Sequence, residues 1–425
     1  MKKIVNEVLK EEVYYEKLEN GLSVYFMPKR GFTKKYAVLA TNYGSNELEF
    51  IPIGENERIR VNEGIAHFLE HKMFEQPDGG NAFDKFSMYG ASANAFTNFT
   101  MTAYLFTATE NFYEALEHLI DYVQTPHFTD ENVEKERGII GQEIMMYDDY
   151  PEWALYMNAM KAMYHNNEIN IDVAGTIETI AEIDKEKLYK IYNSFYTPEN
   201  MIMVLAGGFA PEEVIPKIKE KIIVNDKKET AKRVYNEEPK EIVKTYVEKE
   251  MDISMPCVLI GFKDNDLTGK KIQKDIALEI IGSILLGKSS NAFKKLYEEG
   301  KIFSEPSLQY EFSKTFAHVM IQFQSHEYND VIEEIEKNIE LLKENGIAEE
   351  DFLRSKKKVY GEIVKSYSEP ANTASAMIAD YFKGINSFDY IEEFDNISKE
   401  YVDSVLREIF NKDNKVISVI KCIEK

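Results

Sequence analysis

Residues 61 to 74 read Val61-Asn62-Glu63-Gly64-Ile65-Ala66-His67-Phe68-Leu69-Glu70-His71-Lys72-Met73-Phe74. If this stretch is a helix, His67 and His71 lie one turn apart on the same face, with Glu70 beside them. Its other positions are apolar almost all round, which is typical of a buried helix. We expect Asn62 to cap the start of this helix.

Two buried imidazoles and a carboxylate need partners, because each unsatisfied buried group costs roughly 1 to 3 kcal/mol. A divalent metal ion would satisfy all three side chains together. The alternative is a pair of core histidines bonded to backbone carbonyls, with Glu70 in a salt bridge. We favour the metal, because the inverted order His-x-x-Glu-His is a metalloprotease signature with a known mechanism.

A second acidic helix is predicted from about Asp130 to Tyr147. Within it, Glu136 and Glu143 are seven residues apart, close to two turns, and share a face with Ile140 and Ile144. A carboxylate on an apolar face is costly unless it is paired. Glu143 could join the two histidines in a zinc site, since two His and one Glu are a common catalytic ligand set. It could equally pair with a Lys or Arg.

Residues 91 to 106 are dense in Thr and aromatic residues, which predicts a strand or a hairpin. The small residues Ala93, Asn94 and Ala95 leave the backbone open. On an edge strand, such residues allow an extended peptide to pair through main-chain hydrogen bonds. An ordinary strand inside a sheet explains the composition equally well.

Composition excludes several classes of function. The chain has 425 residues, with 51 Lys and Arg against 74 Asp and Glu, a net charge of -23. Such a surface repels nucleic acids and anionic lipids, so we expect neither as a partner, and it permits basic peptides. Two cysteines, Cys257 and Cys422, are too few for a disulfide framework, and the start of the chain has no signal-peptide pattern. We therefore expect a cytoplasmic protein.

The chain is predicted to consist of two halves, residues 1–225 and 226–425, joined by a charged linker over Val224 to Glu241. The second half repeats the order of the first. Its predicted elements are strands 245–251 and 257–262, helices 271–286 and 291–299, strands 307–312 and 316–324, four helices, and strand 416–420. Glu143-Ile144 precedes Pro151 by the same distance as Glu362-Ile363 precedes Pro370, which supports a repeat. Residues 271–286 contain no histidine, so only the first half should bind metal.

The motifs His67-Phe68-Leu69-Glu70-His71 and Glu136-Arg137-Gly138-Ile139-Ile140-Gly141-Gln142-Glu143 together resemble those of the pitrilysin and insulinase type zinc peptidases, the inverzincins of family M16. The stretch Asn94-Ala95-Phe96-Thr97 also resembles that family's substrate-binding edge strand. The chain is most similar to the short bacterial members and to the mitochondrial processing peptidase subunits. The resemblance extends over the whole chain and is sharpest between residues 61 and 151.

The resemblance implies an α+β fold of two similar halves, each a mainly antiparallel sheet covered by helices, that form a clam-like chamber. It also implies one Zn²⁺ per chain, with His67, His71 and Glu143 as ligands and Glu136 in support behind them. Glu70 would be the general base that activates the zinc-bound water. The implied substrates are unfolded peptides.

The second half departs from the family's pattern. Active relatives carry an Arg and a Tyr there that contact substrate, whereas Tyr297 and Phe303 stand near those positions in this chain. Tyr310 could supply a hydroxyl in their place. Two functions therefore stay open: a zinc endopeptidase acting on short unstructured peptides inside a closed chamber, or a weakly active or non-hydrolytic peptide-binding subunit of a two-chain assembly. We expect a homodimer, or a heterodimer with a related chain.

Overall fold

The computed structural model describes residues 1–222 and 229–423. Their contacts divide the chain into two compact units. Unit 1 comprises Met1–Ile144, Ile171–Tyr235 and Ser366–Ser387, and unit 2 comprises Met145–Asn170, Asn236–Lys365 and Phe388–Lys425. The predicted boundary between residues 225 and 226 lies outside the described residues.

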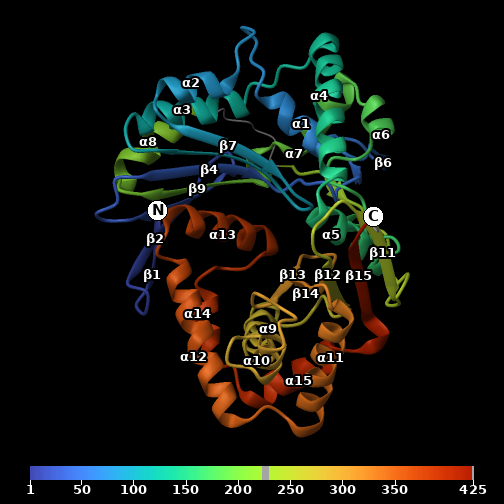
Figure 1. Cartoon of the computed structure of the whole chain (residues 1–425). Coiled ribbons are helices and arrows are strands. Elements are labelled where there is room, and N and C mark those ends of the chain that lie inside the picture. Colours follow the sequence, from blue (N-terminus) through green and yellow to red (C-terminus); the bar gives the residue numbers. More distant parts are fainter. Residues whose placement is uncertain (223–228, 424–425) are drawn as a thin grey trace. The chain divides into compact units, whose positions relative to one another are not determined.

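Unit 1 is built on a seven-stranded sheet with the strand order β1-β2-β3-β9-β4-β8-β7 (Figure 1). All neighbouring strands pair antiparallel except β3 and β9. The turn at Asn20-Gly21 joins β2 to β3 in a hairpin, as an Asn-Gly pair between two strands favours. The bounds are β1 (Lys2–Asn6), β2 (Glu11–Lys17), β3 (Ser23–Pro28), β4 (Lys35–Thr41), β7 (Ser92–Thr97), β8 (Thr102–Ala108) and β9 (Met201–Gly207); a small sheet adds β5 (Glu49–Ile51), β6 (Ile59–Arg60) and β10 (Lys232–Arg233).

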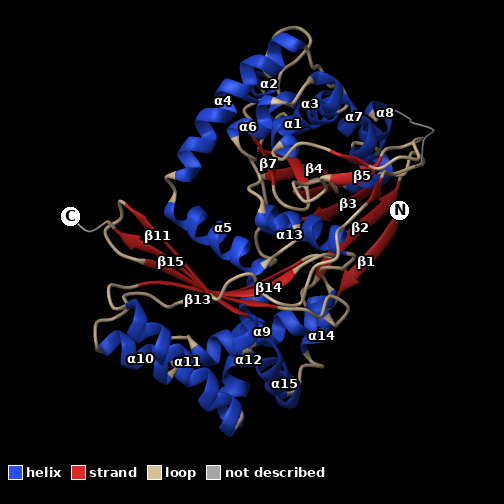
Figure 2. Ribbon diagram, turned by 90° about the vertical axis from the view of Figure 1, so that its right-hand side faces the viewer, coloured by secondary structure: helices blue, strands red, loops and turns tan. Residues whose placement is uncertain are grey.

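Helices cover both faces of this sheet. Figure 2 shows α1, α2, α3 and α8 on one face and α13 on the other. The central strand β9 is buried along its whole length, as its unbroken apolar run predicts. The helices of unit 1 are α1 (Ile65–Met73), α2 (Ala82–Met88), α3 (Phe112–Val123), α6 (Ile177–Ala181), α7 (Lys185–Phe195), α8 (Pro211–Lys221) and α13 (Pro370–Lys383), and α4 (Asp130–Asp148) crosses into unit 2.

Unit 2 is built on a five-stranded sheet with the order β11-β15-β12-β14-β13, in which only β11 and β15 are parallel. The strands are β11 (Tyr246–Met251), β12 (Cys257–Lys263), β13 (Ser307–Phe312), β14 (Ala317–Gln324) and β15 (Lys415–Cys422). Helix α5 (Pro151–Met163) packs on one face, against β12 and β15. The other helices are α9 (Lys271–Leu285), α10 (Asn291–Glu298), α11 (Tyr328–Asn345), α12 (Glu349–Ser366), α14 (Asp389–Phe394) and α15 (Lys399–Ile409).

The predicted fold class is confirmed, because each unit is an α+β structure with a mainly antiparallel sheet. The predicted strands of the second half all form. Within the described chain, five helices rather than four lie between β14 and β15, because residues 389–394 form a separate short helix. No helix among the described residues is both long and apolar enough to cross a bilayer.

Candidate metal centre

Helix α1 starts at a backbone position that only glycine tolerates. Gly64 precedes the helix with a φ of 83°, and a Cβ there would lie 2.3 Å from the carbonyl oxygen of Ala174. The prediction that Asn62 caps α1 was wrong, since no side chain caps this helix. The Asn62 side chain instead bonds to Glu182 and Lys187.

Three side chains from α1 and α4 converge beyond this start. Nε2 of His67 lies 3.6 Å from Oε1 of Glu143, and Nε2 of His71 lies 3.3 Å from Oε2 of Glu143. The donor atoms of the three residues all lie within 4.8 Å of one another. Donors at about 2.0–2.1 Å from a tetrahedral zinc ion are separated by about 3.4 Å. The three side chains therefore fit a single ion.

The geometry also bears on the two alternatives considered from the sequence. Within the described residues, the charged partners of Glu143 are the two histidines rather than a Lys or Arg. His71 faces the carboxylate of Glu136 rather than a backbone carbonyl, and Nδ1 of His67 is buried without a hydrogen-bond partner among the described residues. The three residues could therefore hold a metal ion, and they do not form the satisfied core pair of the alternative.

Glu136 connects His71 to a buried lysine that the sequence analysis missed. Its Oε1 lies 3.1 Å from Nδ1 of His71, and its Oε2 accepts a hydrogen bond of 3.2 Å from Nζ of Lys72. Lys72 is fully buried and also donates to Glu75 at 2.6 Å. The available signal was a lysine on a helix that is otherwise apolar, because a buried ammonium requires an anion.

The two histidines have different proton affinities. Burial and the neighbouring His71 lower the pKa of His67 to about 4. Burial alone would lower the pKa of His71 as well, but its hydrogen bonds with Glu136 and Glu143 outweigh burial and raise that pKa to about 9. Without a metal, His71 therefore carries a proton at neutral pH and His67 does not.

Glu70 lies beside the ligand group without belonging to it. The side chain is buried, and its Oε2 accepts a hydrogen bond of 2.7 Å from the hydroxyl of Thr97. Burial raises the pKa of Glu70, and the Thr97 hydrogen bond opposes this rise. A buried carboxylate with one oxygen fixed and a raised pKa is suited to proton transfer.

Comparison with known proteins identifies the family. Residues 50–177 match the model described as insulinase (peptidase family M16), and residues 182–359 match the model described as the peptidase M16 inactive domain. The chain is 40% identical over 431 residues to the uncharacterized zinc protease YmfH of Bacillus subtilis, covering 100% of both proteins. This chain belongs to peptidase family M16.

Other relatives agree with the predicted family, which is confirmed. The M16 chain is 27% identical over 165 residues to the mitochondrial-processing peptidase subunit beta of Dictyostelium discoideum, covering 38% of this chain and 35% of that subunit. The crystal structure of an M16-like peptidase from Alicyclobacillus acidocaldarius superposes with a TM-score of 0.92 at 34% identity, covering 97% of this chain and 99% of that one.

The polar stretch after α2 forms the hairpin of β7 and β8. Strand β7 is an edge strand of the unit 1 sheet, which confirms the expected position and excludes the interior alternative. Asn94 is exposed, Ala93 and Ala95 are partly buried, and Oδ1 of Asn94 accepts a hydrogen bond of 2.9 Å from the Ala95 N–H. Peptide binding by these three residues stays a prediction.

The residues singled out in the second half all lie in unit 2 of the M16 chain. Tyr297 and Phe303 are exposed. The hydroxyl of Tyr310 donates a hydrogen bond of 2.7 Å to Asp264 and lies 3.3 Å from Nζ of Lys271. Any contact between Tyr310 and a substrate would have to compete with this pairing.

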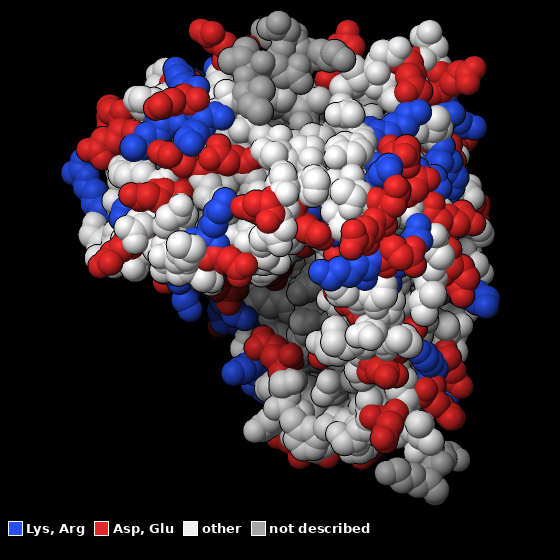
Figure 3. All heavy atoms as spheres, turned by 90° about the horizontal axis from the view of Figure 1, so that it is seen from above, with Lys and Arg blue, Asp and Glu red and all other residues white. Residues whose placement is uncertain are grey.

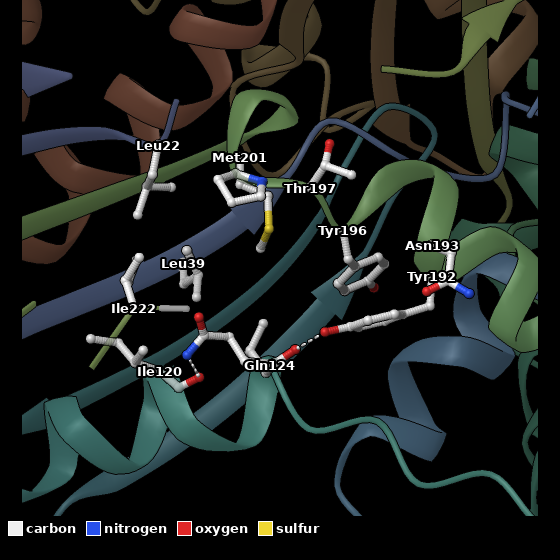
Figure 4. Close-up of a pocket in the computed structure, with 12 residues that line it drawn as sticks. Leu22, Leu39, Ile120, Gln124, Tyr192, Asn193, Tyr196, Thr197, Met201 and Ile222 are labelled. Atoms are coloured by element: carbon white, nitrogen blue, oxygen red, sulfur yellow. Dashed lines mark hydrogen bonds between the residues drawn. The ribbon is translucent and has the colours of Figure 1, made fainter. Parts of the chain in front are cut away.

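Unit 1 also contains a cavity of about 200 Å³ between its sheet and helices α3 and α7. Figure 4 shows Leu39, Ile120 and Met201 around it. The hydroxyl of Tyr192 donates a hydrogen bond of 2.8 Å to the backbone oxygen of Val123. None of the lining residues is charged, and none is a member of the His67, His71 and Glu143 group. The cavity is thus separate from the candidate metal centre.

Proposed function

We propose that this M16 chain is a zinc-dependent endopeptidase that hydrolyses short unstructured peptides. The observation that carries the proposal is the convergence of His67, His71 and Glu143, with Glu70 beside them and outside the ligand group. A subunit that only binds peptides and does not hydrolyse them has no chemical need for the buried, oriented carboxylate of Glu70 next to these three side chains.

In this proposal, His67, His71 and Glu143 hold one zinc ion per chain. Zinc bound there supplies a Lewis acid and a water of lowered pKa. Glu70 accepts the proton of the attacking water and returns it to the leaving amine. Glu136 lies 3.1 Å from Nδ1 of His71 and would fix the orientation of that ring as a ligand.

Substrate binding is proposed at the edge of β7. Residues Ala93 to Ala95 would bind an extended peptide, with main-chain hydrogen bonds from Ala93 and Ala95 and the exposed side chain of Asn94 between them. Main-chain pairing of this kind tolerates many sequences. The net charge of -23 favours basic peptides. Figure 3 shows Asp and Glu side chains interspersed with Lys and Arg across one face, so the attraction would come from the overall excess of acid and not from one patch on that face.

The second candidate function is a weakly active or non-hydrolytic subunit of a two-chain M16-like assembly. It is supported by the second half, where Tyr297 and Phe303 replace the expected Arg and Tyr and the hydroxyl of Tyr310 is bonded to Asp264. Losing a donor that stabilises the transition state costs roughly 10² to 10³ in rate. The enclosing chamber, the homodimer or heterodimer, and the cytoplasmic location stay predictions.

Metal analysis and a peptide digest test both candidates. The purified wild type is expected to contain one zinc ion per chain and to cleave a mixed peptide pool, whereas Glu70→Gln should retain the zinc and lose nearly all cleavage. Absence of zinc, or equal cleavage by both proteins, would refute the endopeptidase. Zinc binding and peptide binding without cleavage by the wild type would establish the second candidate.

A further inference from the structure

Thr97 is the last residue of β7 and the residue that bonds to Glu70. The strand proposed to bind the peptide therefore ends at the side chain that orients the proposed general base. No role followed for Thr97 from the sequence, although it stands in the Asn94-Ala95-Phe96-Thr97 stretch. The backbone of Thr97 faces the free edge of β7, and its side chain faces Glu70.

The backbone direction follows from the register of the hairpin. The N–H of Asn98 bonds to the carbonyl oxygen of Met101, which closes the turn between β7 and β8. In an antiparallel pair, every second residue directs its N–H and C=O toward the neighbouring strand. Residues 98, 96, 94 and 92 therefore bond to β8, and Ala93, Ala95 and Thr97 direct theirs to the free edge. The Ala95 N–H agrees, because it bonds to the Asn94 side chain and not to β8.

The side chain of Thr97 faces the interior of unit 1. Its hydroxyl donates to Oε2 of Glu70 at 2.7 Å and lies 3.2 Å from Oγ1 of Thr102. Thr102 is fully buried and donates to the carbonyl oxygen of Tyr43 at 3.0 Å. The side chain of Thr97 therefore contacts Thr102, which is itself held in place by its hydrogen bond to Tyr43. A shift of the Thr97 backbone would move the hydroxyl that fixes Glu70.

We propose that Thr97 is a positioning residue that couples peptide pairing along β7 to the orientation of Glu70. The coupling rests on the proposed endopeptidase function. A peptide strand that bonds to the backbone of Thr97 immobilises this residue, so its hydroxyl holds Oε2 of Glu70 and leaves Oε1 free for proton transfer. Binding energy from the peptide backbone is thereby used at the reacting centre. The coupling favours extended peptides in which the residue facing Thr97 has a main-chain N–H and C=O free to form hydrogen bonds.

Kinetics of three variants test the side chain. Thr97→Val, which removes the hydroxyl at nearly constant volume, should lower kcat roughly 10- to 100-fold, because a misplaced catalytic group costs about that much. KM should stay within about twofold, and Thr97→Ser should restore most of the rate. Thr107→Val, the same change at the far end of the hairpin opposite Ser92, is the matched control and should behave as the wild type. Zinc content and melting temperature of each variant exclude a folding defect.

A series of peptides N-methylated at one residue at a time tests the coupling to the backbone. In the wild type, methylation at the residue that faces Thr97 should raise KM and lower kcat, whereas in Thr97→Val it should raise KM alone. The coupling would be overturned if Thr97→Val had the kcat of the wild type, or if the substitution and the N-methylation lowered kcat independently of each other. The proposed endopeptidase function would still stand in that case, provided that the wild type cleaves peptides and Glu70→Gln does not. If the wild type with bound zinc cleaves no peptide, the endopeptidase and the coupling both fail.

Discussion

Two histidines from a single helix turn differ in what they bond to. Nδ1 of His71 faces Glu136, whereas Nδ1 of His67 has no partner among the described residues. The difference comes from α4, which brings Glu136 to one ring only. Histidine ligands of metals usually have their second nitrogen fixed by such a partner, so His71 would be the better oriented of the two candidate ligands.

Zinc affinity of the M16 chain is expected to fall as the pH falls. Burial opposes the charge on His71, but Glu136 and Glu143 raise its pKa to about 9, so a proton must leave before zinc binds. Below that pKa, each pH unit should cost about tenfold in apparent affinity. Competition with a zinc chelator at pH 6, 7 and 8 measures this slope.

Glu136→Gln is the control for that measurement, since it removes a hydrogen bond that raises the pKa of His71. The steep part of its affinity profile should move to lower pH. An apparent affinity of the wild type that is the same at pH 6 and pH 8 would contradict the assigned proton on His71.

At the scale of elements, two helices support the predicted repeat. Pro151 begins α5 and Pro370 begins α13, each at the same distance from a Glu-Ile pair. Helix α5 belongs to unit 2, where it packs on β12 and β15, and α13 belongs to unit 1, where it packs on β4 and β9. Each half of the sequence thus supplies a helix to the sheet of the other half.

The start of α1 is expected to tolerate no side chain. Gly64→Ala should lower the free energy of unfolding by about 2 kcal/mol or more, because the left-handed backbone alone costs roughly 1–2 kcal/mol and the new Cβ would clash with Ala174. Urea unfolding of the chelator-treated protein measures the loss.

Gly138→Ala in α4 is the matched control. A Cβ at Gly138 meets no atom within 4 Å, and the residue lies inside a helix, so this change should stabilise by roughly 0.5–1 kcal/mol. Equal stabilities of the two variants would contradict the close approach at Gly64.

At the scale of the whole molecule, the acidic excess is the feature that bears on substrate choice. A chain with a net charge of -23 attracts cationic peptides over distances set by the ionic strength. This attraction acts before any specific contact forms.

Basic peptides are therefore expected to show a lower KM than neutral peptides of equal length at low salt. Raising the ionic strength from about 0.02 M to about 0.5 M shortens the screening length to a few ångströms and should remove most of the difference. KM values for the two peptides at both salt concentrations measure it. A preference that persists at high salt would have to come from specific contacts.

Local spacing was enough to predict part of the site. His71 stands four positions after His67, so any α-helix brings the two side chains to one face. The strands of the second half also follow from local patterns. The family resemblance pointed to the edge position of Ala93 to Ala95 and to Glu143 as the third member of the group.

Other features depend on which segments pack together. The contact of Lys72 with Glu136 spans 64 residues, and that of Thr97 with Glu70 spans 27. The glycine at the start of α1 is required because the carbonyl oxygen of Ala174 approaches it closely. Helices α5 and α13 each belong to the unit whose sheet is formed by the other half of the sequence. The sequence by itself determined which side chains could bind a metal, because helical periodicity is local; only the tertiary structure decided what orients them, because those partners arrive from distant segments.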